Sequence, residues 1–403
     1  MKRALKFFGL FVGAILVLGA IVAAFNVDRL KRLHAVNTLF SEDKITANFS
    51  NMKGAFAFSP IVDSGEVEKW EKLPIPLPTT YSQNGASKST EEWLLESKTT
   101  SLVVVQNGKV SFEKYFLGTK PDDLRISWSV AKSFLSAAFG IAVKDGLIKL
   151  DDTVDKYVPV LKTSAYKGVT VRNVLNMSSG VKFNEDYLDF FSDIKKMGRV
   201  LAIGGSMDEF SASIVETERP QGTARQYVSI DTHVLSMVLR AATGKRLIAY
   251  LGEKIISPIG FSRSPYYTTD SEGNAFALGG LNITTLDFAR FGQMIANGGK
   301  WQGQQIVPAD WISKSTITSA TAPANGDGWG YGYQWWIPPG SAENGGDFIA
   351  RGVYGQYIYI NPKSNTVIVR TAVNRGFRKN RTDGSSAHEN NVAMFRTIAA
   401  TAR

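Results

Sequence analysis

Cysteine is absent from the 403-residue chain, and histidine occurs only three times. The absence of cysteine excludes disulfides, cysteine nucleophiles and thiolate metal sites. A long Gly-rich or Pro-rich tract is also missing, which argues against extended disorder. Apolar residues make up 44% of the chain and charged residues 20%, a composition typical of a globular protein with a sizeable core.

The formal net charge is +10, but the Lys and Arg residues form no dense block. A basic protein can favour anionic lipid, cell-wall polymer or nucleic acid as a partner. Because the charges are spread along the chain, a solvated basic surface is the simpler interpretation. Nothing in the sequence predicts nucleic-acid binding.

One long apolar run, residues 7–25, follows the basic residues Lys2, Arg3 and Lys6. As a helix it is about long enough to cross a hydrocarbon core of ~30 Å, and its layout is that of an export signal. We expect an uncleaved transmembrane helix at residues 1–25, because the run is long for a cleaved signal and lacks a clean A-x-A site. A cleaved signal peptide is the alternative.

The N-terminal run also predicts where the protein is found. We expect it at the inner (cytoplasmic) membrane, with the rest of the chain in the periplasm or outside the cell, or secreted if the segment is cleaved. Residues 26–85 are predicted to be a connector and N-terminal extension, with a Pro-punctuated extended stretch at 73–80.

Strand patterns lie near both ends of the remaining chain. Residues 101–106 and 109–116 flank Asn107-Gly108, a strong hairpin signal. Residues 352–360 and 366–373 predict a second strand pair around Asn361-Pro362.

Helical patterns fill most of the interval between the strands. The expected helices are a short one at 91–97, a strongly apolar one at 130–143, a mostly helical block at about 150–275 and a last one at 389–400. We therefore predict an α+β domain over 86–403, in which one antiparallel sheet built from both ends of the chain is flanked by helices and carries an inserted helical subdomain.

Ser129 and Lys132 form an S-x-x-K pattern at the start of the apolar helix. On a helix this spacing places the hydroxyl and the amine on one face, one turn apart. Serine needs a base within hydrogen-bond reach, and lysine acts as that base when burial lowers its pKa. The pattern recurs at other serines in polar or strand-like stretches, and Ser129 alone is equally well explained as a helix N-cap.

Longer motifs resemble the serine β-lactamase and penicillin-binding-protein superfamily, in particular class C β-lactamases, 6-aminohexanoate-dimer hydrolases and related esterases. The similarity covers residues 90 to 400 and is carried by runs at 145–152, 168–180, 279–281, 287–292 and 330–336. The resemblance implies a serine hydrolase that forms an acyl-enzyme on Ser129, with Lys132 as the base and with no metal or cofactor.

Tyr227-Val228-Ser229 resembles the second motif of this superfamily, with Ser229 in place of the usual Asn. The match implies that Tyr227 shares a proton relay with Lys132 and that Ser229 contacts the substrate. A phenol beside an ammonium is expected to have a lowered pKa. A buried structural tyrosine is the alternative explanation of Tyr227.

Ala350-Arg351-Gly352 occupies the place of the third motif, where Lys-Thr-Gly is usual. The resemblance implies that Gly352 lets the substrate approach the strand and that the Val353 N–H joins that of Ser129 in an oxyanion hole. Arg351 is a candidate substrate contact, although successive strand residues face opposite sides. The missing lysine puts recognition of a β-lactam carboxylate in doubt. Residues 184–187 resemble a substrate-contacting loop, which adds Tyr187 to the candidates.

We therefore expect a membrane-anchored hydrolase of ester or linear amide bonds in a small-molecule substrate. A true β-lactamase or D-amino-acid peptidase is the first alternative, and a catalytically inactive binding or scaffold relative is the second. A Ser-His-Asp triad is disfavoured, because His34, His233 and His388 accompany no G-x-S-x-G elbow. The sequence predicts no particular oligomeric state.

Overall fold

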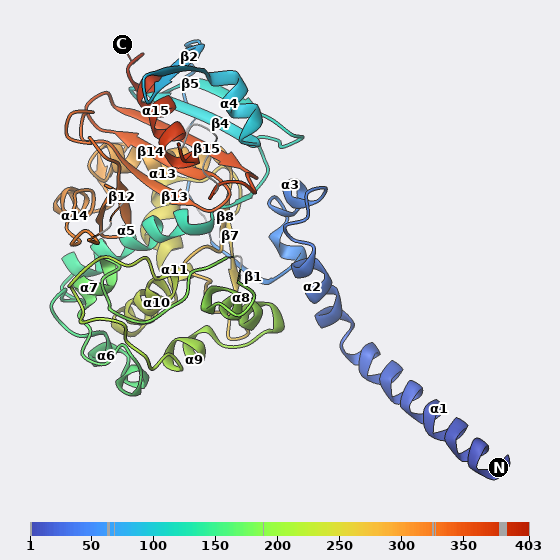
Figure 1. Ribbon diagram of the computed structural model, residues 1–403. Helices are drawn as coiled ribbons and strands as arrows, with labels where there is room; N and C mark the ends of the chain where they lie inside the picture. Colours follow the sequence, from blue (N-terminus) through green and yellow to red (C-terminus); the bar gives the residue numbers. More distant parts are fainter. Residues whose placement is uncertain are drawn as a thin grey trace.

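A computed structural model describes residues 2–62, 65–67, 69–187, 189–324, 326, 328–378 and 385–402, so Met1 and Arg403, the outer ends of the predicted ranges, lie outside it. Its centre is an antiparallel seven-stranded sheet (Figure 1). The strand order is β11 (Gly330–Gly332), β12 (Trp335–Ile337), β13 (Phe348–Gly352), β14 (Gln356–Asn361), β15 (Thr366–Ala372), β4 (Thr99–Gln106) and β5 (Lys109–Tyr115). Because β15 pairs with β4, the sheet joins the two ends of the domain, which confirms the predicted architecture.

The predicted hairpin is present as β4 and β5, joined at Asn107 and Gly108. Both turn residues have positive φ, 51° and 77°, as a tight hairpin turn requires. Side chains of β4 alternate between two apolar cores, with Val103 on one face of the sheet and Leu102 on the other. Helix α13 (Thr285–Ala296) covers the first face, and α15 (Ala387–Ala399) contributes to the core on the second.

A block of helices is inserted in the chain between the sheet strands β5 and β11, as predicted for about 150–275 (Figure 1). It follows α5 (Ala131–Lys144) and ends at Ile259. Its elements are α6 (Val154–Tyr157), η3 (Pro159–Thr163), α7 (Val171–Leu175), α8 (Asp193–Ile203), α9 (Met207–Ala212), α10 (Ser229–Thr243), α11 (Leu247–Leu251), η4 (Gly252–Ile256) and α12 (Ser257–Ile259).

A second, four-stranded sheet was not predicted. Its order is β1 (Ala57–Pro60), β7 (Tyr266–Thr269), β8 (Leu281–Ile283) and β6 (Arg125–Ile126). These strands are too short to give a clear period-two pattern, and β7 lies in the stretch expected to be helical. Through β1 the N-terminal extension becomes part of the folded body.

Other parts of residues 26–98 also pack onto that body. They include α2 (Val27–Asn37), α3 (Ile45–Asn48), η1 (Met52–Gly54), the hairpin β2 (Thr80–Gln83) and β3 (Ala86–Ser89), and α4 (Thr90–Glu96). The Pro-punctuated stretch runs along β5, where Leu73 N–H donates to the Val110 carbonyl at 3.0 Å and Ile75 N–H to that of Ser111 at 2.9 Å. These bonds cover part of an edge strand that would otherwise present unpaired backbone groups.

Two further predictions near the C-terminus had different outcomes. The strand expected over 352–360 is confirmed as β14 only from Gln356 onward, because β13 ends at Gly352 and a turn separates the two strands. The chain reverses between them through Tyr354 and Gly355, whose φ angles are 61° and 93°. The apolar composition of this stretch hides the turn. The expected strand at 366–373 and the last helix are confirmed as β15 and α15.

The remaining elements are β9 (Lys300–Trp301), β10 (Gln304–Gln305) and α14 (Ala309–Ser315).

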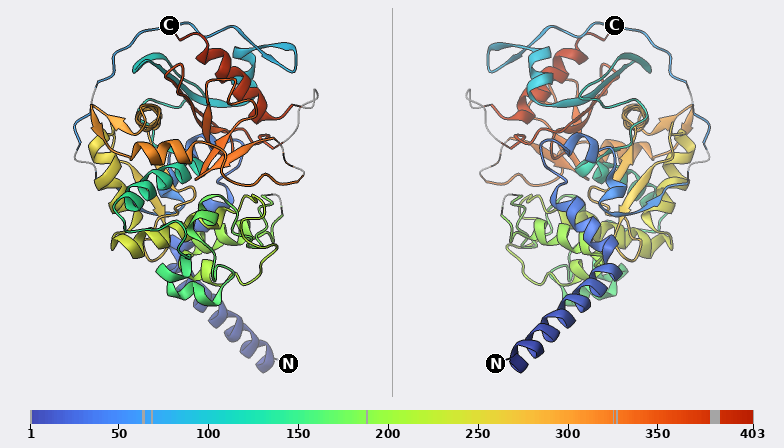
Figure 2. Two further views of the ribbon diagram at one scale, coloured as in Figure 1. Left: turned by 90° about the vertical axis from the view of Figure 1, so that its left-hand side faces the viewer. Right: turned by 90° about the vertical axis from the view of Figure 1, so that its right-hand side faces the viewer.

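Helix α1 (Lys2–Phe25) projects away from the body, and Figure 2 places the two chain termini at opposite ends of the molecule. Most large apolar side chains of α1 are exposed. Within the described part of the chain, no helix has the combination of length and hydropathy that crossing a membrane requires, so the structure does not support the predicted transmembrane helix.

Candidate active site

Ser129 lies in a single helical turn, η2 (Trp128–Val130), between the short strand β6 and helix α5. Ser127 N–H donates to the Leu281 carbonyl at 2.8 Å, so the second sheet holds the start of this turn. Trp128 has a φ of +43°, in the left-handed region that side chains with a Cβ rarely adopt. Such backbone strain is characteristic of functional sites.

Helix α5 is buried along almost its whole length, because its neighbours approach it closely. At Gly140 an added Cβ would lie 2.3 Å from the Trp311 ring, so only glycine allows this packing. The close packing leaves Lys132 with an exposed fraction of 1%.

The Lys132 amine is within reach of the predicted nucleophile. Its Nζ lies 3.3 Å from Ser129 Oγ and 2.9 Å from the Leu278 carbonyl oxygen, to which it donates. Burial lowers the pKa of Lys132 to about 7, and the charges of Glu185 and Asp231 oppose this shift. A large fraction of the amine is therefore neutral near neutral pH, as a base must be.

These two acidic residues were not predicted from the sequence as parts of the site. Glu185 Oε1 accepts a hydrogen bond from the Ser229 N–H, and Asp231 Oδ1 accepts one from the Tyr166 hydroxyl at 2.8 Å. Burial raises the pKa of Glu185 and raises that of Asp231 to about 8. Only their positions hinted at them, since each lies two residues from a predicted substrate contact.

Tyr227 completes the expected group of three residues. The Ser129 hydroxyl is near enough to favour the phenolate of Tyr227, and Lys132 Nζ lies 5.4 Å from the centre of the Tyr227 ring. The same ring stacks on Trp336 at 5.4 Å. The expectation of a lowered pKa is wrong: desolvation of the half-buried phenol raises the pKa of Tyr227, because it disfavours the phenolate more than the nearby positive charges favour it.

Strand β13 runs beside the nucleophile turn. A Cβ added at Gly352 would lie 2.9 Å from the Ser127 carbonyl oxygen and 3.1 Å from the Ser129 nitrogen. Glycine is therefore required here for close approach of the two backbone segments, in addition to any approach by substrate. Val353, the next residue, lines a cavity together with Ser129.

The remaining candidates have different surroundings. The guanidinium of Arg351 packs 3.5 Å from the centre of the Trp336 ring and 4.6 Å from that of Trp329. Tyr187 lines the same cavity as Ser129, and its ring lies 4.5 Å from the guanidinium of Arg378. Ser229 begins α10 and is fully buried.

Two of the three histidines are engaged elsewhere. His233 Nε2 lies 2.8 Å from Asp208 Oδ1, and His388 Nδ1 lies 2.6 Å from the Tyr357 hydroxyl. The Ser129 hydroxyl instead contacts Lys132 and Tyr227. In the described residues, no cluster of three or more His, Asp and Glu side chains is arranged to hold a metal ion.

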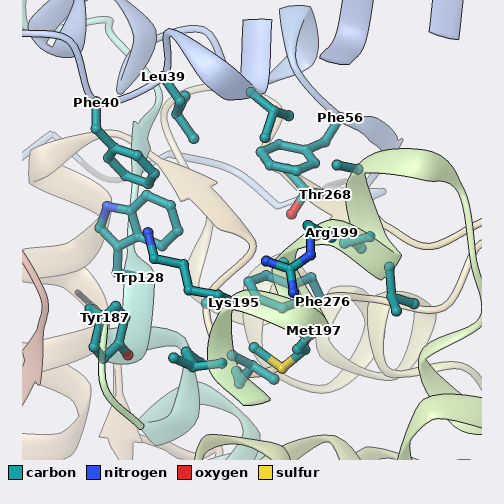
Figure 3. A pocket seen from close by; sticks show the side chains of 18 of the residues that line it. Leu39, Phe40, Phe56, Trp128, Tyr187, Lys195, Met197, Arg199, Thr268 and Phe276 are labelled. Carbon is teal, nitrogen blue, oxygen red and sulfur yellow. The ribbon is translucent and has the colours of Figure 1, made fainter. Parts of the chain in front are cut away.

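Beside Ser129 is a cavity of about 810 Å³, within the range of roughly 300–1,000 Å³ that is usual for ligand sites. Figure 3 shows Leu39, Phe40 and Phe56 from the N-terminal segment facing Lys195, Met197 and Arg199 of α8 across it. The site therefore combines a buried lysine and a partly exposed serine with a large adjoining cavity.

Comparisons with known proteins agree with this geometry. The β-lactamase family profile matches residues 90–387. A 6-aminohexanoate-dimer hydrolase of Paenarthrobacter ureafaciens is 30% identical over 292 residues, which cover 70% of this chain and 74% of the relative.

Solved structures show the same relationship. A Bacillus anthracis protein, provisionally described as a 6-aminohexanoate-dimer hydrolase, has a TM-score of 0.78 and 25% identity, and covers 90% of this chain and 95% of its own. A penicillin-binding protein homologue from Pyrococcus abyssi shares the fold, with a TM-score of 0.56, 21% identity and coverage of 76% and 74%.

The burial of Lys132 makes a prediction that does not depend on any substrate. Titration of selectively labelled lysine, followed by heteronuclear NMR, should give an Nζ midpoint near 7 for Lys132, against about 10.4 for an ordinary lysine. Glu185→Gln removes a negative charge that favours the ammonium, so the midpoint should move to lower pH. Asp186→Asn, which removes an exposed carboxylate from the same loop, is the matched control and should leave it in place. A midpoint of about 10.4 for Lys132 in the wild type would contradict this account.

Proposed function

Because the chain belongs to the β-lactamase family, we propose that it is a serine hydrolase that cleaves ester or linear amide bonds through an acyl-enzyme on Ser129. One observation carries the proposal: the fully buried Lys132 amine lies 3.3 Å from the Ser129 hydroxyl. This pair supplies both a nucleophile and a base, a large fraction of which is neutral near pH 7.

In the proposed reaction, Ser129 Oγ attacks the substrate carbonyl carbon while its proton passes to Lys132 Nζ. The N–H groups of Ser129 and Val353 stabilise the oxyanion of the tetrahedral intermediate. Collapse breaks the ester or amide bond, and the leaving group takes up a proton from Lys132, with Tyr227 in the relay. Water then attacks the acyl-enzyme, Lys132 accepts its proton, and the acid product leaves as Ser129 Oγ regains a proton.

The same site suggests which residues contact the substrate. Tyr187 lines the cavity with Ser129, and Gly352 brings the strand next to the nucleophile turn. Ser229 is joined to the site through its N–H bond to Glu185. We propose that Tyr187, Gly352 and Ser229 position the substrate. We also propose that Arg351 contacts the substrate from its place against the Trp336 ring.

Ester and linear amide substrates are favoured over β-lactams by the third motif. The usual lysine is replaced by Ala350, which is 1% exposed, and the Arg351 guanidinium is stacked on two tryptophans. A substrate carboxylate would therefore lack a charge-assisted hydrogen bond of the kind that contributes ~1.5–3 kcal/mol. A true β-lactamase or D-amino-acid peptidase is the less favoured function, and the Ser129–Lys132 contact argues against an inactive scaffold.

We predict a clear order of substrates. On one preparation, kcat/KM for a p-nitrophenyl ester or a linear p-nitroanilide should exceed that for a chromogenic cephalosporin by at least roughly one power of ten.

Ser129→Ala should reduce the ester rate by orders of magnitude, because the nucleophile is lost. Ser133→Ala, at another buried serine of the same helix, is the matched control. A cephalosporin preference would overturn the substrate assignment, and an active Ser129→Ala variant the mechanism.

Membrane attachment is a separate proposal that rests on α1. Its apolar side chains face solvent, with Leu10 71% and Leu16 68% exposed. A continuous apolar surface of this kind marks an interaction site. We propose that α1 attaches the enzyme to the inner membrane, with the remainder in the periplasm or outside the cell, and that the protein is secreted if α1 is removed.

Fractionation tests this proposal with the full chain. The wild type should sediment with membranes, resist extraction by salt and be released by detergent. Leu10→Asp combined with Leu16→Asp should shift it to the soluble fraction, because charged side chains are costly in lipid. Leu147→Asp, at an exposed leucine on the globular body, is the matched control. Recovery of the wild type in the soluble cytosolic fraction would contradict the proposal.

A further inference from the structure

The cavity beside Ser129 has one wall that comes from outside the matched family region. Residues 33–56, here called the N-terminal wall, contribute Val36, Leu39, Phe40, Met52 and Phe56 to its lining. The family profile begins only at residue 90. This wall of the space next to the nucleophile is therefore built by residues that precede the region matched by the family profile.

The N-terminal wall is fixed in place by contacts with the nucleophile region. The Phe40 ring stacks on Tyr354 at 5.1 Å, and the Phe49 ring lies edge-on to Trp128 at 5.5 Å. The guanidinium of Arg125 donates to the Thr46 carbonyl at 2.8 Å. Since Arg125 belongs to β6, which leads into the nucleophile turn, the wall and Ser129 are held by the same strand.

The opposite wall is α8, most of whose lining residues are apolar, while Lys195, Lys196 and Arg199 add basic groups to the same wall. Ile194, Met197 and Leu201 are among the apolar ones. Trp128, Phe276 and Leu278 add to this surface near the catalytic residues. An apolar surface of this kind favours alkyl groups, since each buried methylene contributes ~0.8 kcal/mol.

We propose that this cavity binds the acyl chain of the substrate, and that the substrate class is therefore an ester or amide of a long, apolar acyl group. The inference rests on the proposed function, because it places the scissile carbonyl at Ser129. A cavity of about 810 Å³ is far larger than an acetyl group needs. The N-terminal wall and α8 enclose the chain from two sides.

The position of α1 is consistent with a lipid source for such a substrate. Helix α1 ends at Phe25 and α2 begins at Val27, and Leu33 and Val36 of α2 already line the cavity. The apolar helix and the cavity wall are thus successive parts of one segment. A long acyl chain is the shared chemistry, whether it is presented from a bilayer or as a monomer in solution.

Chain-length dependence tests the inference in the full-length protein. For p-nitrophenyl esters from acetate to octanoate, kcat/KM should rise about two- to fourfold for each added methylene. Gly198 of α8 lines the cavity, and an added Cβ would meet no atom within 4 Å. Gly198→Phe should therefore fill the cavity and lower the octanoate-to-acetate ratio of kcat/KM by at least tenfold. Gly198→Ala is the matched control, whose ratio should stay within about twofold of wild type.

A second variant guards against misfolding of the first. Val36→Glu places a carboxylate on the N-terminal wall and should lower the same ratio. Fatty-acid release from phosphatidylcholine vesicles, measured in parallel, distinguishes a substrate presented by a bilayer from one that is monomeric in solution. Either source supports the inference if Gly198→Phe suppresses hydrolysis of the long acyl chain.

The outcomes separate this inference from the proposed function. If acetate ester is hydrolysed in a Ser129-dependent way but kcat/KM does not rise with chain length, the acyl cavity is wrong and the hydrolase stands. A rise that both variants leave unchanged also overturns the acyl cavity. If neither the acetate nor the octanoate ester is hydrolysed, or if Ser129→Ala hydrolyses them normally, the proposed function itself fails.

Discussion

The rest of this site depends on one interaction, the contact of the buried Lys132 amine with the Ser129 hydroxyl at 3.3 Å. Desolvation favours the neutral amine by several kcal/mol relative to water. Glu185 and Asp231 act in the opposite direction, because their negative charges favour the ammonium. Their own pKa values are raised by burial, which limits that effect near neutral pH. The balance leaves the pKa of Lys132 at about 7, where the amine can take up and return a proton.

The fold maintains this environment through backbone segments that approach more closely than a side chain would allow. Gly352 brings the central sheet against the nucleophile turn, and Gly140 brings Trp311 against α5. The second sheet holds the turn from the other side through β6. Because the N-terminal segment pairs with this sheet through β1, the wall of the cavity beside Ser129 and the nucleophile are supported by one structure. The nucleophile turn and the proposed acyl cavity therefore share their scaffold.

The sequence was informative where residues are close along the chain. The S-x-x-K pattern, the Asn107-Gly108 hairpin and the helix α5 each follow from local spacing, and the family motifs identified Tyr227 and Gly352. It was uninformative where the chemistry depends on long-range packing. Apart from the nearness of Glu185 and Asp231 to predicted substrate contacts, no local pattern marks them as neighbours of Lys132, and none marks residues 33–56 as a cavity wall. The reversed pKa direction of Tyr227 has the same origin, since its burial comes from the assembled site.

The central claim is a covalent acyl-enzyme on Ser129, and mass spectrometry of a quenched reaction tests it most directly. The intact protein should gain the mass of one acyl group when acid-quenched during turnover of a p-nitrophenyl ester. Peptide mapping should place that group on the peptide containing Ser129, and the gain should be absent in Ser129→Ala. Lys132→Arg should show little adduct, because a guanidinium stays protonated and cannot act as the base. An adduct on another residue, or continued turnover by Ser129→Ala, would contradict the account.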